Sequence, residues 1–190
     1  MIAGVRPAIE ITDPIINYKI MKIYEKLASA INDQINFELT SAYLYLSLSN
    51  FWKEKGRTGV ANWFRIQAKE EVAHAEIFMN YVHDRDGIVR LAPIEQVKQE
   101  WSSLQEAFAD TLAHEQTVTK RIYALYDVAE AEKDYATRQM LNWYIAEQVE
   151  EEASVQEILD NLTLVGEDGT GILQIDRELG ARTYTAPQPK

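Results

Sequence analysis

Four segments of the chain carry apolar residues at alternating spacings of three and four, and a glutamate interrupts each stripe near its midpoint. The four stripes are Ile31, Ile35, Glu38, Ala42, Tyr45 and Ser49; Phe64, Gln67, Glu71, His74, Phe78 and Tyr81; Phe108, Thr111, Glu115, Val118, Ile122 and Leu125; and Leu141, Tyr144, Gln148, Glu151, Val155 and Ile158. If the four helices form a bundle, the four carboxylates meet in one buried layer. Buried carboxylates repel one another and lose hydration, so this layer requires cations or protons.

The ligand types in this layer favour a transition metal. Glu71 and His74 form a Glu-x-x-His pair, and the i, i+3 offset puts both side chains on one helix face. One histidine beside several glutamates is an oxygen-rich set that suits two iron ions, although zinc and manganese fit the same ligands. We predict that Glu71 bridges two metal ions. Glu38 and His74 then complete one site, and Glu115 and Glu151 complete the other.

Two further residues of the stripes lie close to this predicted centre. Tyr45, one heptad after Glu38, either hydrogen-bonds a ligand or supplies an electron, or else it packs in the core with a satisfied hydroxyl. Gln148 either orients a ligand or is a weak ligand itself. Of the other histidines, we predict a surface position for His83 and a surface or supporting position for His114.

The spacing of the helices predicts their topology. We expect helices over about 21–54, 60–85, 104–132 and 135–164, with a short fifth helix over 172–179 and another helix start at Asp13-Pro14. Short links make the first pair and the second pair antiparallel hairpins. A connector of about 16 residues, which includes Pro93, spans roughly 50 Å when extended, whereas a 28-residue helix is about 42 Å long. The connector therefore either crosses the whole bundle, which we favour, or returns to the same end.

Composition excludes several classes of protein. The 190 residues fit one domain, and the absence of cysteine excludes disulfides, thiolate metal sites and cysteine nucleophiles. No run approaches 18 apolar residues, and the first residues do not look like a signal peptide, so we expect a cytoplasmic protein without a membrane partner. The net charge of −11 argues against nucleic acid as a partner. That charge is compatible with a protein that attracts cations, but by itself it more often indicates an ordinary solvated acidic surface.

Four sequence segments resemble one family in order and register: FELTSAYLYL, AKEEVAH, HEQ and YIAEQVEEEAS. They are similar to the non-haem ferritins of bacteria and archaea over roughly residues 22–182. The resemblance implies an all-α, ferritin-like four-helix bundle with one long crossover and a short fifth C-terminal helix. It also implies a ferroxidase that oxidises Fe(II) with O2 or peroxide and stores ferric mineral inside a 24-subunit shell.

The resemblance also assigns residues to iron sites. It implies a first iron site at Glu38, Glu71 and His74, and a second at Glu71, Glu115 and Glu151, with Gln148 beside it and Tyr45 as the family's tyrosine. It implies a third iron site near the centre at Glu70, Glu147, Glu150 and Glu151. Residues 1–20 form a leader outside the resemblance, 21–182 the ferritin-like domain, and 183–190 a C-terminal tail.

Residues that differ from those of related families restrict which cofactors and metal sites we predict. Bacterioferritins bind haem through a methionine next to the bridging glutamate, and Val72 stands at that position, so we predict no haem. Gln148 and Glu151 stand where those proteins carry a second Glu-x-x-His pair. Two alternatives remain: a passive shell whose layer binds zinc or protons, and another di-iron oxidase such as a rubrerythrin-like peroxidase. The absence of cysteine argues against the latter, which usually carries a cysteine-ligated iron domain.

Overall fold

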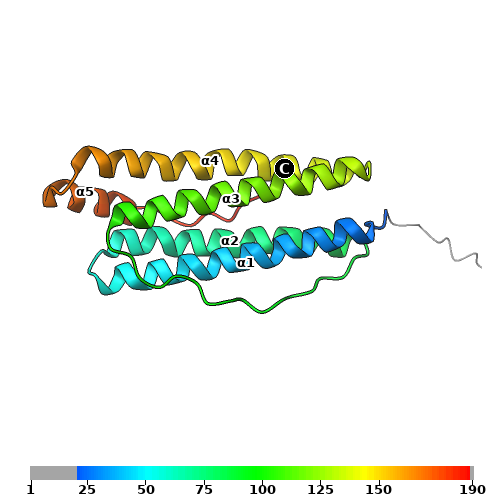
Figure 1. Ribbon diagram of the computed structural model, residues 1–190, viewed down its shortest axis with the longest axis horizontal. Coiled ribbons are helices and arrows are strands. Elements are labelled where there is room, and N and C mark those ends of the chain that lie inside the picture. Colours follow the sequence, from blue (N-terminus) through cyan, green and yellow to red (C-terminus); the bar gives the residue numbers. More distant parts are fainter. Residues whose placement is uncertain (1–20, 189–190) are drawn as a thin grey trace, which may run out of the picture.

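Four long helices, packed side by side, form the body of the protein. The structure is a computed structural model that describes residues 21–188. In Figure 1, α1 (Glu25–Glu54), α2 (Thr58–Asp84), α3 (Leu104–Ala131) and α4 (Tyr135–Val165) lie along the long axis, and α5 (Gly169–Gly180) sits at one end. The described residues contain no strand. The predicted all-α bundle with a fifth helix is therefore confirmed.

Side chains cap α3, α4 and α5 at or close to the predicted positions. Ser103 accepts a hydrogen bond from the Glu106 backbone N–H at 3.1 Å, and Asp134 accepts one from the Thr137 N–H at 3.0 Å. These contacts satisfy N–H groups that have no partner within the helix. Helix α5 begins at Gly169, three residues before the predicted start, because Asp168 caps it through the Gly171 N–H. The predicted start at Asp13-Pro14 lies outside the described residues.

The segment between α2 and α3 crosses the length of the bundle and carries no regular secondary structure (Figure 1). Asn32 and Asn36 of α1 accept hydrogen bonds from the backbone N–H groups of Arg90 and Ala92, at 2.6 and 2.7 Å. Further along α1, the Ser47 hydroxyl donates to the Lys98 carbonyl at 2.8 Å. The crossover therefore runs alongside α1 from its first half to its second, and the predicted crossover is confirmed.

The hydrophobic core is divided into two clusters. One cluster includes Tyr45, Trp52, Phe64 and Phe108, and the other includes Ile31, Phe78, Ile122 and Leu141. Along every long helix, the residues before and after the central glutamate belong to different clusters. The glutamate layer therefore separates two apolar regions that hold the helices together on either side of it.

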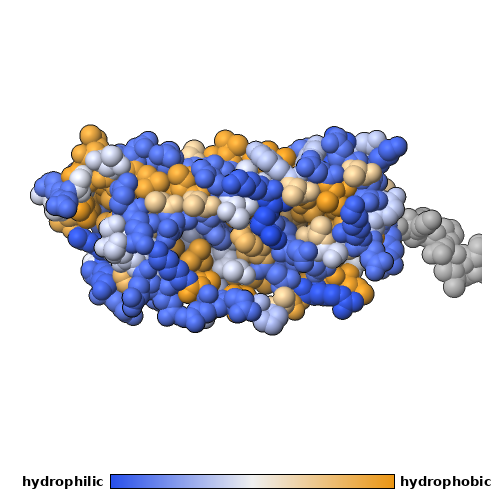
Figure 2. Space-filling model, in the orientation of Figure 1, coloured by the Kyte–Doolittle hydropathy of each residue, from blue (hydrophilic) through white to orange (hydrophobic). Residues whose placement is uncertain are grey.

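The outer surface is mostly hydrophilic on the face shown in Figure 2, with hydrophobic groups in separate patches. Large apolar side chains exposed on the molecule include Tyr43 on α1 and Ile88 and Leu91 on the crossover. No helix in the described part of the chain is long and apolar enough to cross a membrane.

Candidate metal centre

The structure buries all five predicted central ligands in the middle of the bundle. Their exposed fractions are 1% for Glu38, 2% for Glu71, 3% for His74, 0% for Glu115 and 7% for Glu151. Each of the four long helices contributes at least one of them. An ordinary helix would place leucine at such depths, so these side chains are not explained by packing.

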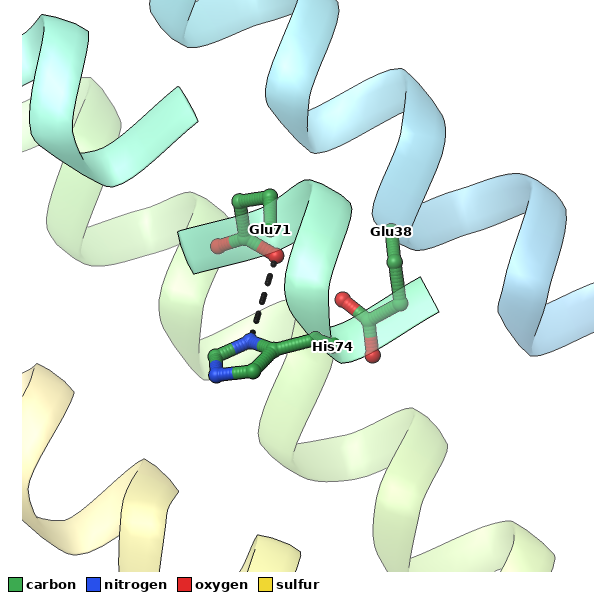
Figure 3. A group of neighbouring side chains, drawn as sticks. All are labelled: Glu38, Glu71 and His74. Carbon is green, nitrogen blue, oxygen red and sulfur yellow. Dashed lines mark ion pairs between the residues drawn. The ribbon is translucent and has the colours of Figure 1, made fainter. Parts of the chain in front are cut away.

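Glu38, Glu71 and His74 form a compact group between α1 and α2. Figure 3 shows the three side chains pointing toward one another. One ligand atom from each residue lies within 4.8 Å of the others, and Glu71 Oε2 is 3.6 Å from His74 Nδ1. This arrangement follows from the i, i+3 offset on α2 and from α1 lying against that face.

Several polar atoms of this group have no hydrogen-bond partner among the residues that the structure describes. They are Glu38 Oε2, Glu71 Oε2 and His74 Nε2, all buried. An unsatisfied buried polar atom costs about 1–3 kcal/mol, so three in one place are a large penalty for the metal-free protein. His74 Nδ1 faces Glu71 Oε2, whereas the unpartnered Nε2 lies 3.9 Å from Glu147 Oε1. Carboxylate oxygens beside an imidazole are a suitable donor set for a divalent transition metal. The residues present therefore fit a bound metal ion.

Glu115 and Glu151 lie in the same layer but are held by hydrogen bonds of their own. Glu115 accepts hydrogen bonds from the Tyr45 hydroxyl and from Gln148 Nε2, the latter at 3.2 Å. Glu151 Oε2 accepts one from Gln67 Nε2 at 2.8 Å. The structure thus brings three of the five predicted ligands together. It leaves the other two beside them, each fixed by neutral neighbours.

Electrostatics of the layer favour a cation. Burial raises the pKa of Glu71 well above its usual range, and the nearby carboxylates of Glu115 and Glu38 raise it further. Burial, followed by the charge of Glu151, raises the pKa of Glu115 to about 8. Burial also raises the pKa of the Tyr45 hydroxyl, which keeps that group a hydrogen-bond donor. A bound metal ion would reverse these shifts by stabilising the carboxylate form.

Two glutamines support the centre and were missing from the predicted site. Gln34 Nε2 donates to Glu38 Oε1 at 2.9 Å, and its own oxygen accepts from Arg121 at 3.0 Å. Gln67 is the donor to Glu151. The sequence contains a signal for both, since Gln34 lies four residues before Glu38 and Gln67 interrupts the apolar stripe of α2.

The residues of the predicted third site differ in burial: Glu151 is buried, Glu70 and Glu147 are partly buried, and Glu150 is exposed. Glu147 is half-buried, with Oε1 3.9 Å from His74 Nε2. Burial raises the pKa of Glu70 to about 7, although the Arg182 guanidinium, 2.7 Å away, acts to lower it. Glu150 is exposed, so the structure does not bring it into the buried layer.

The remaining histidines take supporting or surface positions. His114 Nε2 lies 2.7 Å from the Ser41 hydroxyl, and its ring stacks on Phe37 with centroids 5.3 Å apart. Burial lowers the pKa of His114 to about 4, so it is neutral at neutral pH. His83 is exposed near the end of α2. Both placements agree with the positions expected from sequence.

Comparison with known proteins identifies the family. The sequence matches the Ferritin-like domain family over residues 28–165. The chain belongs to this family. It is 39% identical over 160 residues to the bacterial non-heme ferritin of Staphylococcus aureus (strain USA300), a match that covers 84% of this chain and 96% of that ferritin. Identity to the bacterial non-heme ferritin of Bacteroides fragilis (strain 638R) is 42%, covering 84% and 99% of the two chains.

Solved structures support the same ferritin assignment. The open-pore ferritin of the hyperthermophilic archaeon Archaeoglobus fulgidus superposes with a TM-score of 0.84 at 46% identity, covering 85% of this chain and 100% of that one. A closed form of that ferritin, engineered by site-directed mutagenesis, gives a TM-score of 0.85 at 46% identity, covering 86% and 100%. The resemblance to non-haem ferritins seen in the sequence is therefore confirmed.

Proposed function

We propose that this protein is an iron-storage ferritin. It oxidises Fe(II) to Fe(III) at a di-iron centre within each subunit and stores the ferric mineral inside a hollow 24-subunit shell. The observation that carries the proposal is the buried group of Glu38, Glu71 and His74 with its unpartnered ligand atoms. Its relatives named bacterial non-heme ferritins support iron as the metal.

Two Fe(II) ions per subunit are the substrate. The first binds Glu38, Glu71 and His74; the second binds Glu71, Glu115 and Glu151, once Tyr45 and Gln67 rearrange their hydrogen bonds. Each ion offsets part of the negative charge that burial makes costly. Each Fe(II) gives up one electron, and O2 takes both electrons with two protons to form H2O2. The Fe(III) product then leaves the layer and hydrolyses to mineral.

Neighbouring residues prepare the centre for this reaction. The amides of Gln34 and Gln67 hold Glu38 and Glu151 in place without adding charge. The Tyr45 hydroxyl donates to Glu115 in the metal-free centre, before the second iron ion binds. Gln148 donates to the same carboxylate and remains a candidate weak ligand.

Self-association into the shell is supported by the apolar side chains exposed on α1 and the crossover, including Tyr43, Ile88 and Leu91. The net charge of −11 raises the local concentration of cations at the protein surface. The same charge disfavours nucleic acid as a partner. We also propose a cytoplasmic location. We propose no bound haem, because exposed Val72 offers no ligand where bacterioferritins place a methionine.

Stopped-flow oxidation of Fe(II) in air tests the proposal. Increasing amounts of Fe(II), to beyond two ions per subunit, are added to metal-free protein, and wild type is compared with Glu71→Gln and with a matched control, Glu157→Gln. Glu157 is an exposed residue of α4 outside the layer. We expect a fast phase that saturates near two ions per subunit in wild type and control, and a rate in Glu71→Gln lower by about 100-fold or more.

Two results would contradict the ferroxidase assignment. Oxidation by wild type no faster than in a protein-free solution would leave a passive container or a site for another metal. Saturation near one ion per subunit would show that Glu115 and Glu151 keep their hydrogen bonds and that the centre is mononuclear. Shell formation by each variant is checked by size-exclusion chromatography, so that loss of rate is not confused with loss of assembly.

A further inference from the structure

The segment that follows α5 turns back along the bundle (Figure 1), and its Arg182 contacts Gln67 and Glu70 of α2. Arg182 fixes this segment to α2. Its carbonyl accepts a hydrogen bond from Asn62 Nδ2 at 3.0 Å, and its guanidinium lies over the Trp63 ring, 5.0 Å from the centroid. Two residues later, the Tyr184 ring lies under the Lys69 ammonium at 5.6 Å. The C-terminal segment is therefore seated on α2 in a defined way.

The guanidinium of Arg182 binds two residues of α2 at once. Nη2 donates to Glu70 Oε2 at 2.7 Å, and Nη1 donates to Gln67 Oε1. The amide nitrogen of the same side chain, Gln67 Nε2, donates to Glu151 Oε2 at 2.8 Å. A continuous chain of hydrogen bonds therefore joins the C-terminal segment to a ligand of the buried layer.

Arg182 places a positive charge at this acidic edge of the layer. The carboxylates of Glu147 and Glu151 lie close enough to act electrostatically on Glu70. His74 Nε2, which is buried and unpartnered, faces the same edge, 3.9 Å from Glu147 Oε1. Among the described residues, the ion pair that Glu70 forms is with Arg182. The guanidinium thus offsets the negative charge of Glu70, a carboxylate on which the charges of Glu147 and Glu151 also act.

The ion pair of Arg182 and Glu70 is partly exposed to solvent. Its side chains are 28% and 16% exposed, whereas the structural pair of Arg85 and Asp134 is 10% and 3% exposed. Water and salt screen the more exposed pair, so a divalent cation can displace the guanidinium at a modest cost. The planar fork of arginine matches two acceptors at once, which a lysine ammonium does not.

We propose that Arg182 is a tethered internal cation that competes with a divalent metal ion for Glu70. While it is bound, it limits how many metal ions the edge between α2 and α4 holds. When a metal ion takes Glu70, Arg182 leaves, and Gln67 loses the partner that helps to hold it against Glu151. Arg182 is a positioning residue, because it acts on the ligand Glu151 through Gln67. The inference rests on the proposed function only in requiring that the layer binds metal.

Zinc titration calorimetry of the metal-free assembled protein tests the competition without any redox step. Five proteins are compared: wild type, Arg182→Gln, Arg182→Lys, the double variant Glu70→Gln/Arg182→Gln, and Arg177→Gln. Arg177 is the matched control, because it is an exposed arginine of α5 outside the layer. We expect the weakest bound Zn(II) to bind about two- to fivefold more tightly in Arg182→Gln, as expected for removing a competing ion pair.

The other variants separate competition from simple anchoring of the segment. Arg182→Lys keeps the charge and should show a smaller gain in the same direction. The double variant should lose the gain, because it lacks the carboxylate that the metal would take. Arg177→Gln should match wild type. If Arg182→Gln fails to assemble, Arg182→Lys still decides, since competition requires it to gain affinity.

Equal Zn(II) affinities in wild type, Arg182→Gln and Arg182→Lys would overturn the inference. So would a gain that persists undiminished in the double variant, because the metal would then not be binding Glu70. If wild type binds no Zn(II) in the layer at all, the proposed function itself fails. The proposed function also fails if Glu71→Gln binds its tightest Zn(II) as well as wild type does, whereas failure of the competition alone leaves that difference intact.

Discussion

Replacing Glu115 by glutamine tests whether the metal-free layer is destabilised by its own charge. Glu115 is fully buried, and burial raises its pKa from the usual 4.5 to about 8. Because the folded protein binds this proton more tightly than the unfolded chain, the group's contribution to stability is fully present below about pH 4.5. It is lost progressively as the pH rises to about 8.

The size of this effect follows from the pKa difference. Neutral pH lies about 2.5 pH units above the pKa of the unfolded carboxyl, which corresponds to about 3 kcal/mol of stability lost relative to low pH. Glutamine carries no charge and keeps the shape of the side chain. Its oxygen still accepts from the Tyr45 hydroxyl, and Gln148 can rotate its amide to face the new NH2 group. We therefore expect Glu115→Gln to stabilise the metal-free protein at pH 7 and above.

Thermal unfolding at several pH values measures the effect. A change of 1 kcal/mol shifts the midpoint by about 2–4 °C in a domain of this size, so the metal-free variant should melt about 6–12 °C above wild type at pH 7. Near pH 5 most of the difference should vanish. Glu157→Gln, an exposed glutamate of α4, should follow wild type at every pH. Saturating Zn(II) should reverse the order, because the variant lacks a ligand.

The prediction is wrong if the unfolding midpoints of wild type and Glu115→Gln change with pH in parallel. If wild type and Glu115→Gln lose stability equally between pH 5 and pH 8, then Glu115 is not the source of the penalty. The charge would then have to be neutralised by protons shared among the other carboxylates of the layer.

Further predictions concern the scaffold. A Cβ at Gly59 would lie 1.5 Å from the Asp176 carbonyl oxygen, so Gly59→Ala should detach α5 and destabilise the protein by about 2–3 kcal/mol, measured by thermal unfolding. Gly169→Ala, whose Cβ meets nothing within 4 Å, should be nearly neutral. Asp134→Asn leaves buried Arg85 unpaired and should cost about 2–3 kcal/mol in denaturant unfolding. Glu130→Gln, which opens the exposed pair with Arg138, should cost less than about 1 kcal/mol.

The sequence predicts both the helices and the burial of the glutamates, because both follow from the 3.6-residue period of the α-helix. Residues three and four apart share a helix face, so the position of Glu38 in its stripe is enough to predict that its side chain is buried. Length arithmetic predicts that the connector crosses the bundle. It does not predict that Asn32 and Asn36 bind the crossover's backbone, because an isolated polar residue on a helix does not reveal its partner.

The hydrogen-bond pattern inside the layer is the part that sequence does not provide. Glu115 and Glu151 are predicted to join a second metal site, and their burial agrees with that prediction. Their bonds to Tyr45 and Gln67 depend on side-chain rotamers and on helix rotation, which spacing does not determine. Arg182 is harder still, since its contact with Glu70 joins residues 112 apart in sequence.

The division of the core explains why the centre can be costly without unfolding the protein. Apolar clusters on both sides of the layer clamp the four helices independently of the carboxylates, so the energy that holds the bundle does not come from the site. The unsatisfied atoms of Glu38, Glu71 and His74 can then remain buried in the metal-free state, where they favour the binding of a cation. For the same reason, Glu71→Gln should remove metal binding while leaving the helices packed. A variant that lost its fold along with its metal would show that the layer, rather than the clusters, holds the helices together.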